Sequence, residues 1–526
     1  MRPGLGAVWF ALAVLLLPAN GPARPPLAPP TAPPPLDAPS GVYYEIFVRS
    51  FYDSNGDGIG DLAGITAKLD YLQHLGVSGI WLTPINPSSS YHGYDVTDYY
   101  AINPQFGTMT DFERLLKQAH RRGIKVLMDL VINHSSDRNP WFRQALDPHS
   151  AYHDWYVWAG KDADLKRENP WGDPAWRTAP DGQHYLGVFS AQMPDFNYDD
   201  PALRREMIKV GRFWLHRGVD GFRLDAAKHI YINFKSDDDN PRAIAKNLAW
   251  WRQFHDAMKK VDSDVFLVGE VSADQQIELA PYYAALNSVF DFPIAATLID
   301  SARDERSADL GCRLHRALER FGKHARGPVD DTPFLSNHDQ DRVMNQLDGN
   351  ADHMRMAAAM LLTLPGRPFI YYGEEIGMRG TKPDPDIREP MRWDRGTHAA
   401  GETTWEPDKM NADPQVSVAA EQGNPDSLLH FYRRLIHWRA ELPALRDGEI
   451  TPYPADQGPI AAYLRADAGQ RLLVVHNLSG APRRVKLLAG TWRAVIRRSR
   501  DGVRLDGHTL VMPAYSTAIV QSPRTS

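Results

Sequence analysis

Cysteine is almost absent from this chain of 526 residues. Cys312 is the only one, so an internal disulfide is excluded and stability must come from a buried core. An excess of basic residues is absent too, because the formal net charge is −6 and the sequence pI is near 6.3. Binding to nucleic acid or to an anionic membrane surface is therefore not expected, and a neutral or small polar partner fits better.

Long apolar runs are equally scarce, and the main one lies near the N-terminus. Arg2 precedes an apolar run over Ala7–Leu17, and small residues follow over Ala19–Ala23. This pattern is typical of a signal peptide over residues 1–23, and the run is too short to span a membrane in the mature protein. Export without disulfides is typical of bacteria, so we expect a periplasmic or extracellular protein with no membrane insertion.

The rest of the chain alternates between two kinds of segment. Residues 24–40 are rich in proline and alanine and predict an extended tether. From Val42 onward, β-branched or aromatic runs alternate with amphipathic stretches, which predicts a parallel sheet of about eight strands, the number of a (β/α)₈ TIM barrel. The expected strands are YYEIFV, GIWLTP, IKVLMDLVIN, GFRLD, VFLVGE, SVFDF, PFLSN and PFIYYG, and helices are expected over 62–75, 112–122, 202–217, 244–259, 354–364 and 428–439.

Two regions depart from this alternation. Residues 134–198 carry many Trp, Asp, Pro and Gly without a helical period, which predicts an inserted subdomain after strand 3, over the face where barrel active sites lie. Short alternating runs such as RLLVVHNL and STAIVQ predict a C-terminal antiparallel β-sandwich over 443–526. The expected fold is thus α/β, with the barrel over 41–133 and 199–442.

Four acidic residues follow predicted barrel strands: Asp129, Asp225, Glu270 and Asp339. Cleavage of a glycosidic bond with retention needs one carboxylate to attack and another to protonate the leaving oxygen, about 5–5.5 Å apart, and adjacent strand ends could supply both. A single acid at such a place is often only a helix cap or a salt-bridge partner. Arg223 lies two residues before Asp225, so both side chains share a face and the cation would favour the ionised carboxylate.

Four segments then resemble the signature regions of the α-amylase family of glycoside hydrolases, in the same order and spacing. They are DLVINH (129–134), GFRLDAAKH (221–229), VGEV (268–271) and FLSNHD (334–339), and the resemblance extends from Gly41 to the C-terminus. It implies that Asp225 is the nucleophile, Glu270 the acid/base, and Asp339 the third carboxylate, which stabilises the transition state. It also implies that His134, Arg223 and His338 bind the sugar nearest the cleaved bond.

Finer motifs bear on the branch of the family. Lys228 and His229 are similar to the pair that lines the leaving-group side in α-amylases, and YHGYD (91–95) resembles an amylase motif with Tyr94 as a stacking platform. MPDFN (193–197) is intermediate between branches, and IREPMRWD (387–394) looks like an oligo-1,6-glucosidase segment. The intermediate α-amylases, between the oligo-1,6-glucosidase and neopullulanase groups, fit best.

The loop DSNGDGIGD (53–61) offers oxygen atoms at alternate positions, as Ca²⁺ requires. The candidate ligands are Asp53, Asn55, Asp57, the Ile59 carbonyl and Asp61. Gly64 stands where an EF-hand has its closing glutamate, so the resemblance to relatives with a calcium site on the first barrel loop is the better interpretation; a solvated acidic turn is the alternative. The family also implies a second calcium site with Asn133 and the His229 carbonyl.

These observations predict retaining hydrolysis of α-1,4-glucosidic bonds in starch-like glucans through a covalent glycosyl-Asp225 intermediate. An α-glucosidase, oligo-1,6-glucosidase or transglycosylase would use the same three carboxylates and is the first alternative. A non-catalytic sugar-binding protein on the same barrel is the second. We expect an α-glucan or maltooligosaccharide as partner, Ca²⁺ as cofactor and a monomer.

Overall fold

The computed structural model describes residues 41–237, 239–396, 399–489 and 492–522. The predicted signal peptide (1–23) and tether (24–40) lie outside the described residues.

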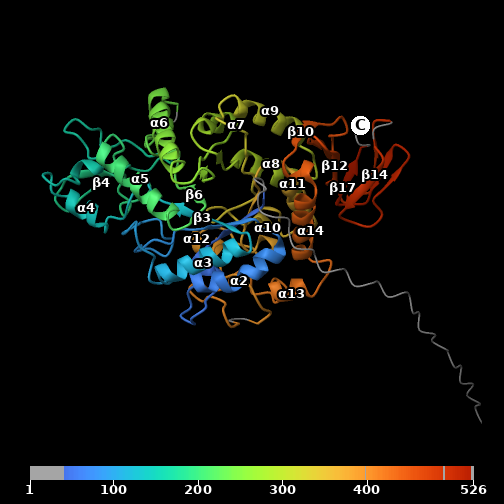
Figure 1. Ribbon diagram of the computed structural model, residues 1–526, viewed down its shortest axis with the longest axis horizontal. Helices are drawn as coiled ribbons and strands as arrows, with labels where there is room; N and C mark the ends of the chain where they lie inside the picture. The colour runs from blue at the N-terminus through green and yellow to red at the C-terminus, as the bar shows by residue number, and fades with distance from the viewer. Residues whose placement is uncertain (1–40, 238, 397–398, 490–491, 523–526) are drawn as a thin grey trace, which may run out of the picture. The chain divides into compact units, whose positions relative to one another are not determined.

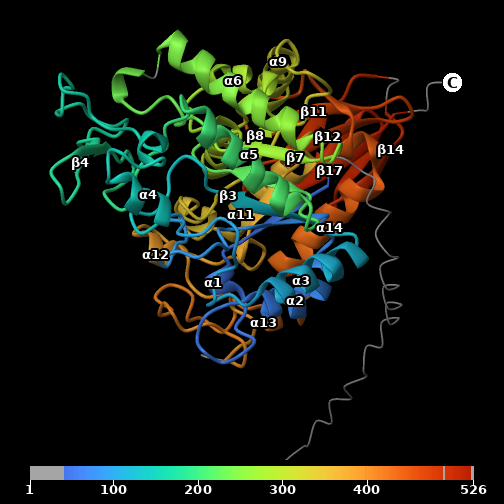
Figure 2. The same ribbon diagram turned by 60° about the vertical axis from the view of Figure 1, so that its left-hand side comes forward.

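The central element is a parallel sheet of seven strands in the order β8-β7-β6-β3-β2-β1-β9. All residues of β1, β2, β6 and β7 are buried, as expected when helices surround a parallel sheet (Figures 1 and 2). The strands are β1 Tyr43–Ile46, β2 Gly79–Leu82, β3 Lys125–Leu130, β6 Gly221–Leu224, β7 Phe266–Gly269, β8 Ser288–Val289 and β9 Phe369–Tyr371.

The eighth barrel position is held by the segment Thr332–Leu335, which differs from a regular strand. Phe290 pairs with Thr332 in parallel, and the Phe369 N–H donates to the Pro333 carbonyl at 2.9 Å, so this segment joins β8 to β9 and closes the barrel. Pro333 has no N–H to donate, which explains why the expected strand PFLSN does not form a full ladder.

The helices cover the outside of the sheet, and most begin at a side-chain cap. Asp61 accepts from the Gly64 N–H at the start of α2, and Gly76, at φ 97°, ends that helix in the left-handed conformation that glycine tolerates. The six expected helices correspond to α2 Leu62–Leu75, α3 Met109–Arg121, α5 Pro201–Leu215, α6 Pro241–Met258, α11 Ala351–Thr363 and α14 Leu428–Glu441.

Other helices were not expected. The end of YYEIFV turns into α1 rather than extending the strand, and two helices, α8 and α9, separate β8 from the closing segment. The additional helices are α1 Val48–Phe51, α4 Pro140–Ala145, α7 Gln276–Leu279, α8 Phe292–Arg303, α9 Leu310–Gly322, α10 Val343–Gln346, α12 Asp384–Ile387, α13 Val418–Gln422 and α15 Pro443–Arg446.

The segment between β3 and α5 forms the insert. It holds the hairpin of β4 Trp176–Thr178 and β5 His184–Leu186, and its last residues return to its start, where Asp195 bridges to His134. Its core consists largely of aromatic rings, such as Phe142 packed against Tyr156 at 4.9 Å between centroids.

The C-terminal region has two antiparallel sheets, β10-β11-β12-β17-β14 and β13-β16-β15. Alternate residues of β12 serve two cores: Leu472 and Val474 join the large barrel core, whereas Leu473 and Val475 face the second sheet. The strands are β10 Glu449–Pro452, β11 Ile460–Ala466, β12 Arg471–Asn477, β13 Arg483–Lys486, β14 Ala494–Arg498, β15 Arg504–Asp506, β16 Thr509–Met512 and β17 Ser516–Gln521.

Among the described helices, none combines the length and the apolar character needed to cross a bilayer.

Candidate active site

One buried guanidinium organises the carboxylates at the carboxyl ends of the strands. Arg223 of β6 is 1% exposed, and its Nη1 donates to Asp225 Oδ1 at 2.6 Å and to Asp129 Oδ1 at 3.0 Å. Its Nη2 lies 2.9 Å from Glu270 Oε2. The two-residue spacing of Arg223 and Asp225 thus places both side chains on one face, and the neighbouring strand β7 delivers Glu270 to the same cation.

The backbone beside Asp225 adds a second link between these two carboxylates. The Ala226 N–H donates to Glu270 Oε2 at 2.9 Å. Ala226 has a φ of 46°, a left-handed conformation that is costly for a residue with a Cβ. Strained backbone of this kind is often found at functional sites. Here the left-handed conformation of Ala226 accompanies an N–H that points toward the candidate acid/base.

Asp339 is held from two sides. Arg388 Nη2 donates to its Oδ1 at 2.8 Å, and His338 Nε2 lies 3.2 Å from its Oδ2. Burial opposes ionisation, but His338, Arg388 and Arg223 outweigh it and lower the pKa of Asp339 to about 2. This carboxylate is therefore expected to be ionised near neutral pH.

The pKa values of the other two carboxyl groups move in the opposite direction. Burial raises the pKa of Glu270, Arg223 opposes the shift, and the Asp225 and Asp339 carboxylates add to it. Burial also raises the pKa of Asp225. Arg223 lowers that pKa, as expected from the sequence, but its effect does not outweigh burial. A raised pKa suits a glutamic acid that must deliver a proton near neutral pH.

A set of hydrogen bonds fixes the histidine and tyrosine beside Asp339. Glu45 and Asp339 raise the pKa of His338 against its burial, and His338 Nδ1 donates to Glu45 Oε1 at 2.5 Å. The Tyr94 hydroxyl donates to Asp129 at 3.0 Å, and its ring lies parallel to His338 with centroids 5.5 Å apart. Tyr94 is half-buried, so one face of its ring is supported by His338, as a sugar-stacking platform requires.

The remaining expected sugar-binding residues lie at the rim between barrel and insert. His134 is 2% exposed; burial lowers its pKa to about 4, and its Nε2 lies 3.1 Å from the Tyr94 carbonyl. His229 is also buried, with Nδ1 donating to the Ile232 carbonyl at 2.8 Å, and Lys228 is half-buried beside it. The structure therefore brings all nine expected catalytic and sugar-binding residues to one end of the barrel.

The comparisons with known proteins bear on this arrangement. Residues 45–448 match the family described as the catalytic domain of α-amylase, and residues 460–519 match the C-terminal domain of the α-amylase SusG. The chain is 40% identical over 471 residues to α-amylase 3 of Dictyoglomus thermophilum, an alignment that covers 89% of this chain and 90% of that protein. This chain belongs to the α-amylase family, glycoside hydrolase family 13.

Two further relatives, one an α-amylase and the other a transferase, are similar to this chain over most of their length. The crystal structure of an α-amylase from H. orenii has a TM-score of 0.85 and 44% identity, covering 92% of this chain and 100% of that one. A 4-α-glucanotransferase of Thermotoga neapolitana is 34% identical over 433 residues, which cover 81% of this chain and 92% of that protein. The family membership, the barrel and the C-terminal antiparallel sheets predicted from the sequence are confirmed.

Sequence reasoning gave no role to two residues that hold the active site of this α-amylase-family protein. Arg388 lies in IREPMRWD, a segment noticed only as a branch marker, yet it contacts Asp339 directly. Glu45 lies in the first strand, where an acid between Tyr44 and Ile46 on a buried strand was an available signal. Asp129 was a strand-end candidate, and in the structure it is fully buried and orients Arg223 and Tyr94.

The candidate calcium loop is wound by its own side chains. Asp53, Asn55 and Asp57 each accept a hydrogen bond from a backbone N–H two residues on, which curls the loop tightly. Asp61 instead accepts from Ser54 and from the Gly64 N–H at the start of α2. In the described ranges, no three His, Cys, Asp or Glu side chains gather in an arrangement that could hold a metal ion. Asp53 is likewise engaged, because it accepts from the Gly56 and Gly58 N–H groups at 2.7 Å. All five expected ligands thus lie on this one curled loop, and a cation there stays a prediction.

At the second calcium position implied by the family, the barrel and insert make direct contact. Asn133 Nδ2 donates to Asp195 Oδ1 at 2.8 Å, and the Val188 N–H donates to Asp195 Oδ2 at 2.7 Å. Burial raises the pKa of Asp195 to about 7. Asp195 therefore places carboxylate oxygens of the insert beside Asn133, and a metal at this place stays a prediction.

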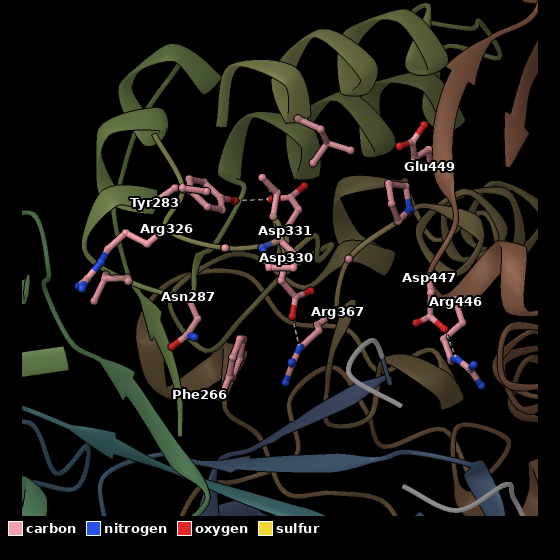
Figure 3. Close-up of a pocket in the computed structure, with 18 of the residues that line it drawn as sticks. Phe266, Tyr283, Asn287, Arg326, Asp330, Asp331, Arg367, Arg446, Asp447 and Glu449 are labelled. Carbon is pink, nitrogen blue, oxygen red and sulfur yellow. Dashed lines mark hydrogen bonds and ion pairs between the residues drawn. The ribbon is translucent and has the colours of Figure 1, made fainter. Parts of the chain in front are cut away.

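The structure also has a hollow of about 720 Å³ at the opposite, amino-terminal end of the strands (Figure 3). Several of its charged groups pair with each other: Arg367 with Asp330, and Arg446 with Asp447 at 2.7 Å. The Tyr283 hydroxyl donates to Asp331 at 3.0 Å. Barrel enzymes place their chemistry at the carboxyl ends, so this hollow is separate from the active site.

Proposed function

We propose that this protein is an α-amylase that hydrolyses α-1,4-glucosidic bonds in starch and maltodextrins with retention of configuration. The observation that supports this most strongly is that one guanidinium binds both carboxyl groups. Arg223 Nη1 lies 2.6 Å from Asp225 Oδ1, and Arg223 Nη2 lies 2.9 Å from Glu270 Oε2. A retaining glycosidase needs two carboxyl groups that are close enough to act on the same anomeric carbon from opposite sides.

In the first step, a carboxylate oxygen of Asp225 attacks C1 of the sugar. The Glu270 carboxyl group donates its proton to the departing glycosidic oxygen, which leaves a covalent glycosyl-Asp225 ester. Positive charge develops on the ring as the bond breaks, and the Asp339 carboxylate, whose pKa is lowered, stabilises it.

In the second step, the roles of Glu270 reverse. Its carboxylate takes a proton from water, the water oxygen attacks C1, and Asp225 departs as a carboxylate. The raised pKa of Glu270 serves both steps, because the group can hold a proton and return to that state after turnover.

Three features support the amylase branch over the alternatives. Lys228–His229 and Tyr91 match the amylase pattern, and the relatives named above include two α-amylases. The 4-α-glucanotransferase relative keeps transglycosylation open, because that reaction differs only in whether a sugar replaces water. A purely sugar-binding role has no support, since all three carboxylates are present.

A time course of products tests this proposal. The purified protein is incubated with soluble starch, pullulan and maltose, and products are separated by chromatography. We expect mixed maltooligosaccharides from starch and little action on maltose. Glucose as the sole product from maltose, with starch untouched, would refute the amylase assignment in favour of an α-glucosidase.

We also propose a Ca²⁺ ion on the loop 53–61, held by Asp53, Asn55, Asp57, the Ile59 carbonyl and Asp61. Ca²⁺ prefers such oxygen donors, and a bound ion would stabilise the folded chain. We expect chelation to lower the midpoint of thermal unfolding by about 5 °C and added Ca²⁺ to restore it.

A matched pair of variants locates the effect in this loop. Asp57→Asn should lose most of the Ca²⁺-dependent rise in unfolding temperature. Asp98→Asn changes an exposed aspartate that likewise accepts from the N–H two residues on, at 2.8 Å from Tyr100, and should keep the rise. An unfolding temperature that is unchanged by chelation in the unsubstituted protein would exclude the site.

We further propose that the protein is exported after removal of residues 1–23, on the strength of the N-terminal pattern. We also propose that it is a monomer.

A further inference from the structure

The insert presents an aromatic ring to solvent close to the active site. Trp171 is 57% exposed, the largest exposed fraction among the exposed large hydrophobic residues of the described chain. An exposed tryptophan forgoes the stabilisation that burial of its large apolar surface would bring. Its position therefore calls for an explanation other than stability.

The turn that carries Trp171 is held rigidly. Asn169 is 2% exposed, and its Oδ1 accepts from the Trp171 N–H at 3.0 Å and the Asp173 N–H at 2.9 Å. Its Nδ2 donates to the Val188 carbonyl at 2.9 Å, which ties the turn to the strand-like segment that precedes Phe189. A fixed turn keeps the ring in one place without ordering it at each binding event.

Ring contacts connect Trp171 to the active site. Its ring centroid lies 5.2 Å from Phe189 and 5.4 Å from His229. Phe189 is half-buried and lies in turn 5.2 Å from His134 and 5.6 Å from His229. Trp171 is therefore the outermost ring of a cluster that begins at the ends of β3 and β6.

The chain connects the cluster to the two reacting carboxyl groups through His229. His229 is four residues beyond Asp225, and the intervening Ala226 N–H contacts Glu270, the group that protonates the leaving oxygen. We propose that Trp171, supported by Phe189, is a stacking platform for the glucosyl unit on the leaving-group side. This inference rests on the proposed function, because it takes Asp225 and Glu270 in the roles given above.

Such a platform would also bind an accepting sugar after the leaving group has departed. The accepting hydroxyl oxygen then bonds to C1, its proton passes to the Glu270 carboxylate, and the C1–Asp225 ester bond breaks. The result is a longer maltooligosaccharide, formed without any oxidant or additional cofactor. Trp171 thereby favours transfer as well as the binding of long substrates.

Two substrates separate this role from a general one. α-Maltosyl fluoride at low concentration has no sugar on the leaving-group side, whereas maltoheptaose extends across it. We expect Trp171→Ala to lower kcat/KM for maltoheptaose about tenfold, the order of one lost aromatic contact, mainly through KM. Hydrolysis of α-maltosyl fluoride should change less than about twofold. The ratio of transfer products to hydrolysis products from concentrated maltotriose should decrease.

Further variants complete the test. Trp171→Phe should restore at least half of the maltoheptaose activity, because it restores an aromatic face. Leu165→Ala, an exposed position of the same insert at 41%, is the matched control and should leave both substrates unaffected. Equal losses on both substrates, or none on maltoheptaose, would overturn the platform. Failure of the unsubstituted protein to hydrolyse α-maltosyl fluoride would instead overturn the proposed function.

Discussion

Asp225→Asn should reduce kcat/KM for starch and for α-maltosyl fluoride by about 10⁴-fold or more, the scale on which removal of a nucleophile acts. The amide has the size of the carboxylate but cannot attack C1. The rate should therefore be low on both substrates, because even the good leaving group of α-maltosyl fluoride cannot replace the nucleophile. Initial rates on both substrates measure the loss. A slow fluorinated glycosyl fluoride should label the unsubstituted protein on the peptide that carries Asp225, as mass spectrometry can show.

The fold of this variant should persist, because Arg223 keeps Asp129 and Glu270 as partners. Circular dichroism and the unfolding temperature check this. Asp274→Asn makes the same change at an exposed position four residues beyond Glu270 and should retain full activity. More than about a tenth of the original activity in folded Asp225→Asn would mean that the nucleophile lies elsewhere.

Glu270→Gln should have a second large effect, but one that depends on the leaving group. We expect kcat on maltooligosaccharides to fall about 10²- to 10⁴-fold, the usual contribution of general acid catalysis. α-Maltosyl fluoride needs little protonation, so its first step should survive and the glycosyl-Asp225 intermediate should accumulate. Added azide, which needs no general base, should then release α-maltosyl azide.

The pH dependence gives an independent measure of the same residue. Glu270 must be protonated to act as an acid, so kcat/KM should fall as pH rises through its pKa. Burial raises that pKa, so the basic limb of the profile should lie above the ordinary range of a glutamic acid. Because Asp225 and Glu270 interact, the pKa observed in the profile belongs to the pair rather than to Glu270 alone. Glu270→Gln should lose this limb. Glu113→Gln, an exposed glutamate of α3, should keep it, and an unchanged profile in Glu270→Gln would contradict the assignment.

Much of the active site followed from local spacing. Strands β6 and β7 pair Leu224 with Gly269, so the next residue on each, Asp225 and Glu270, must emerge side by side. Arg223 follows from alternation along β6. These relations need only a parallel sheet, which the alternating pattern of the sequence predicts.

What escaped prediction depends on contacts between distant segments. Arg388 reaches Asp339 from a loop 49 residues further along, and Glu45 reaches His338 across 293 residues. No local period encodes such pairs, because they form only when the barrel closes. The closing segment itself was taken for a regular strand, although Pro333 removes one of its donors.

The closing segment, Thr332–Leu335, also bears on the thermal stability of the barrel. Seven strands share a continuous ladder, whereas Thr332–Leu335 is attached by few backbone bonds, among them Asp291 N–H to Thr332 O at 3.1 Å and Phe369 N–H to Pro333 O at 2.9 Å. Local opening follows the density of such bonds, so we expect this join to open before the longer ladders of the sheet. Asp339 stands four residues beyond it, so on warming we expect the third carboxylate to depend on its contacts with Arg388 and His338 rather than on the sheet.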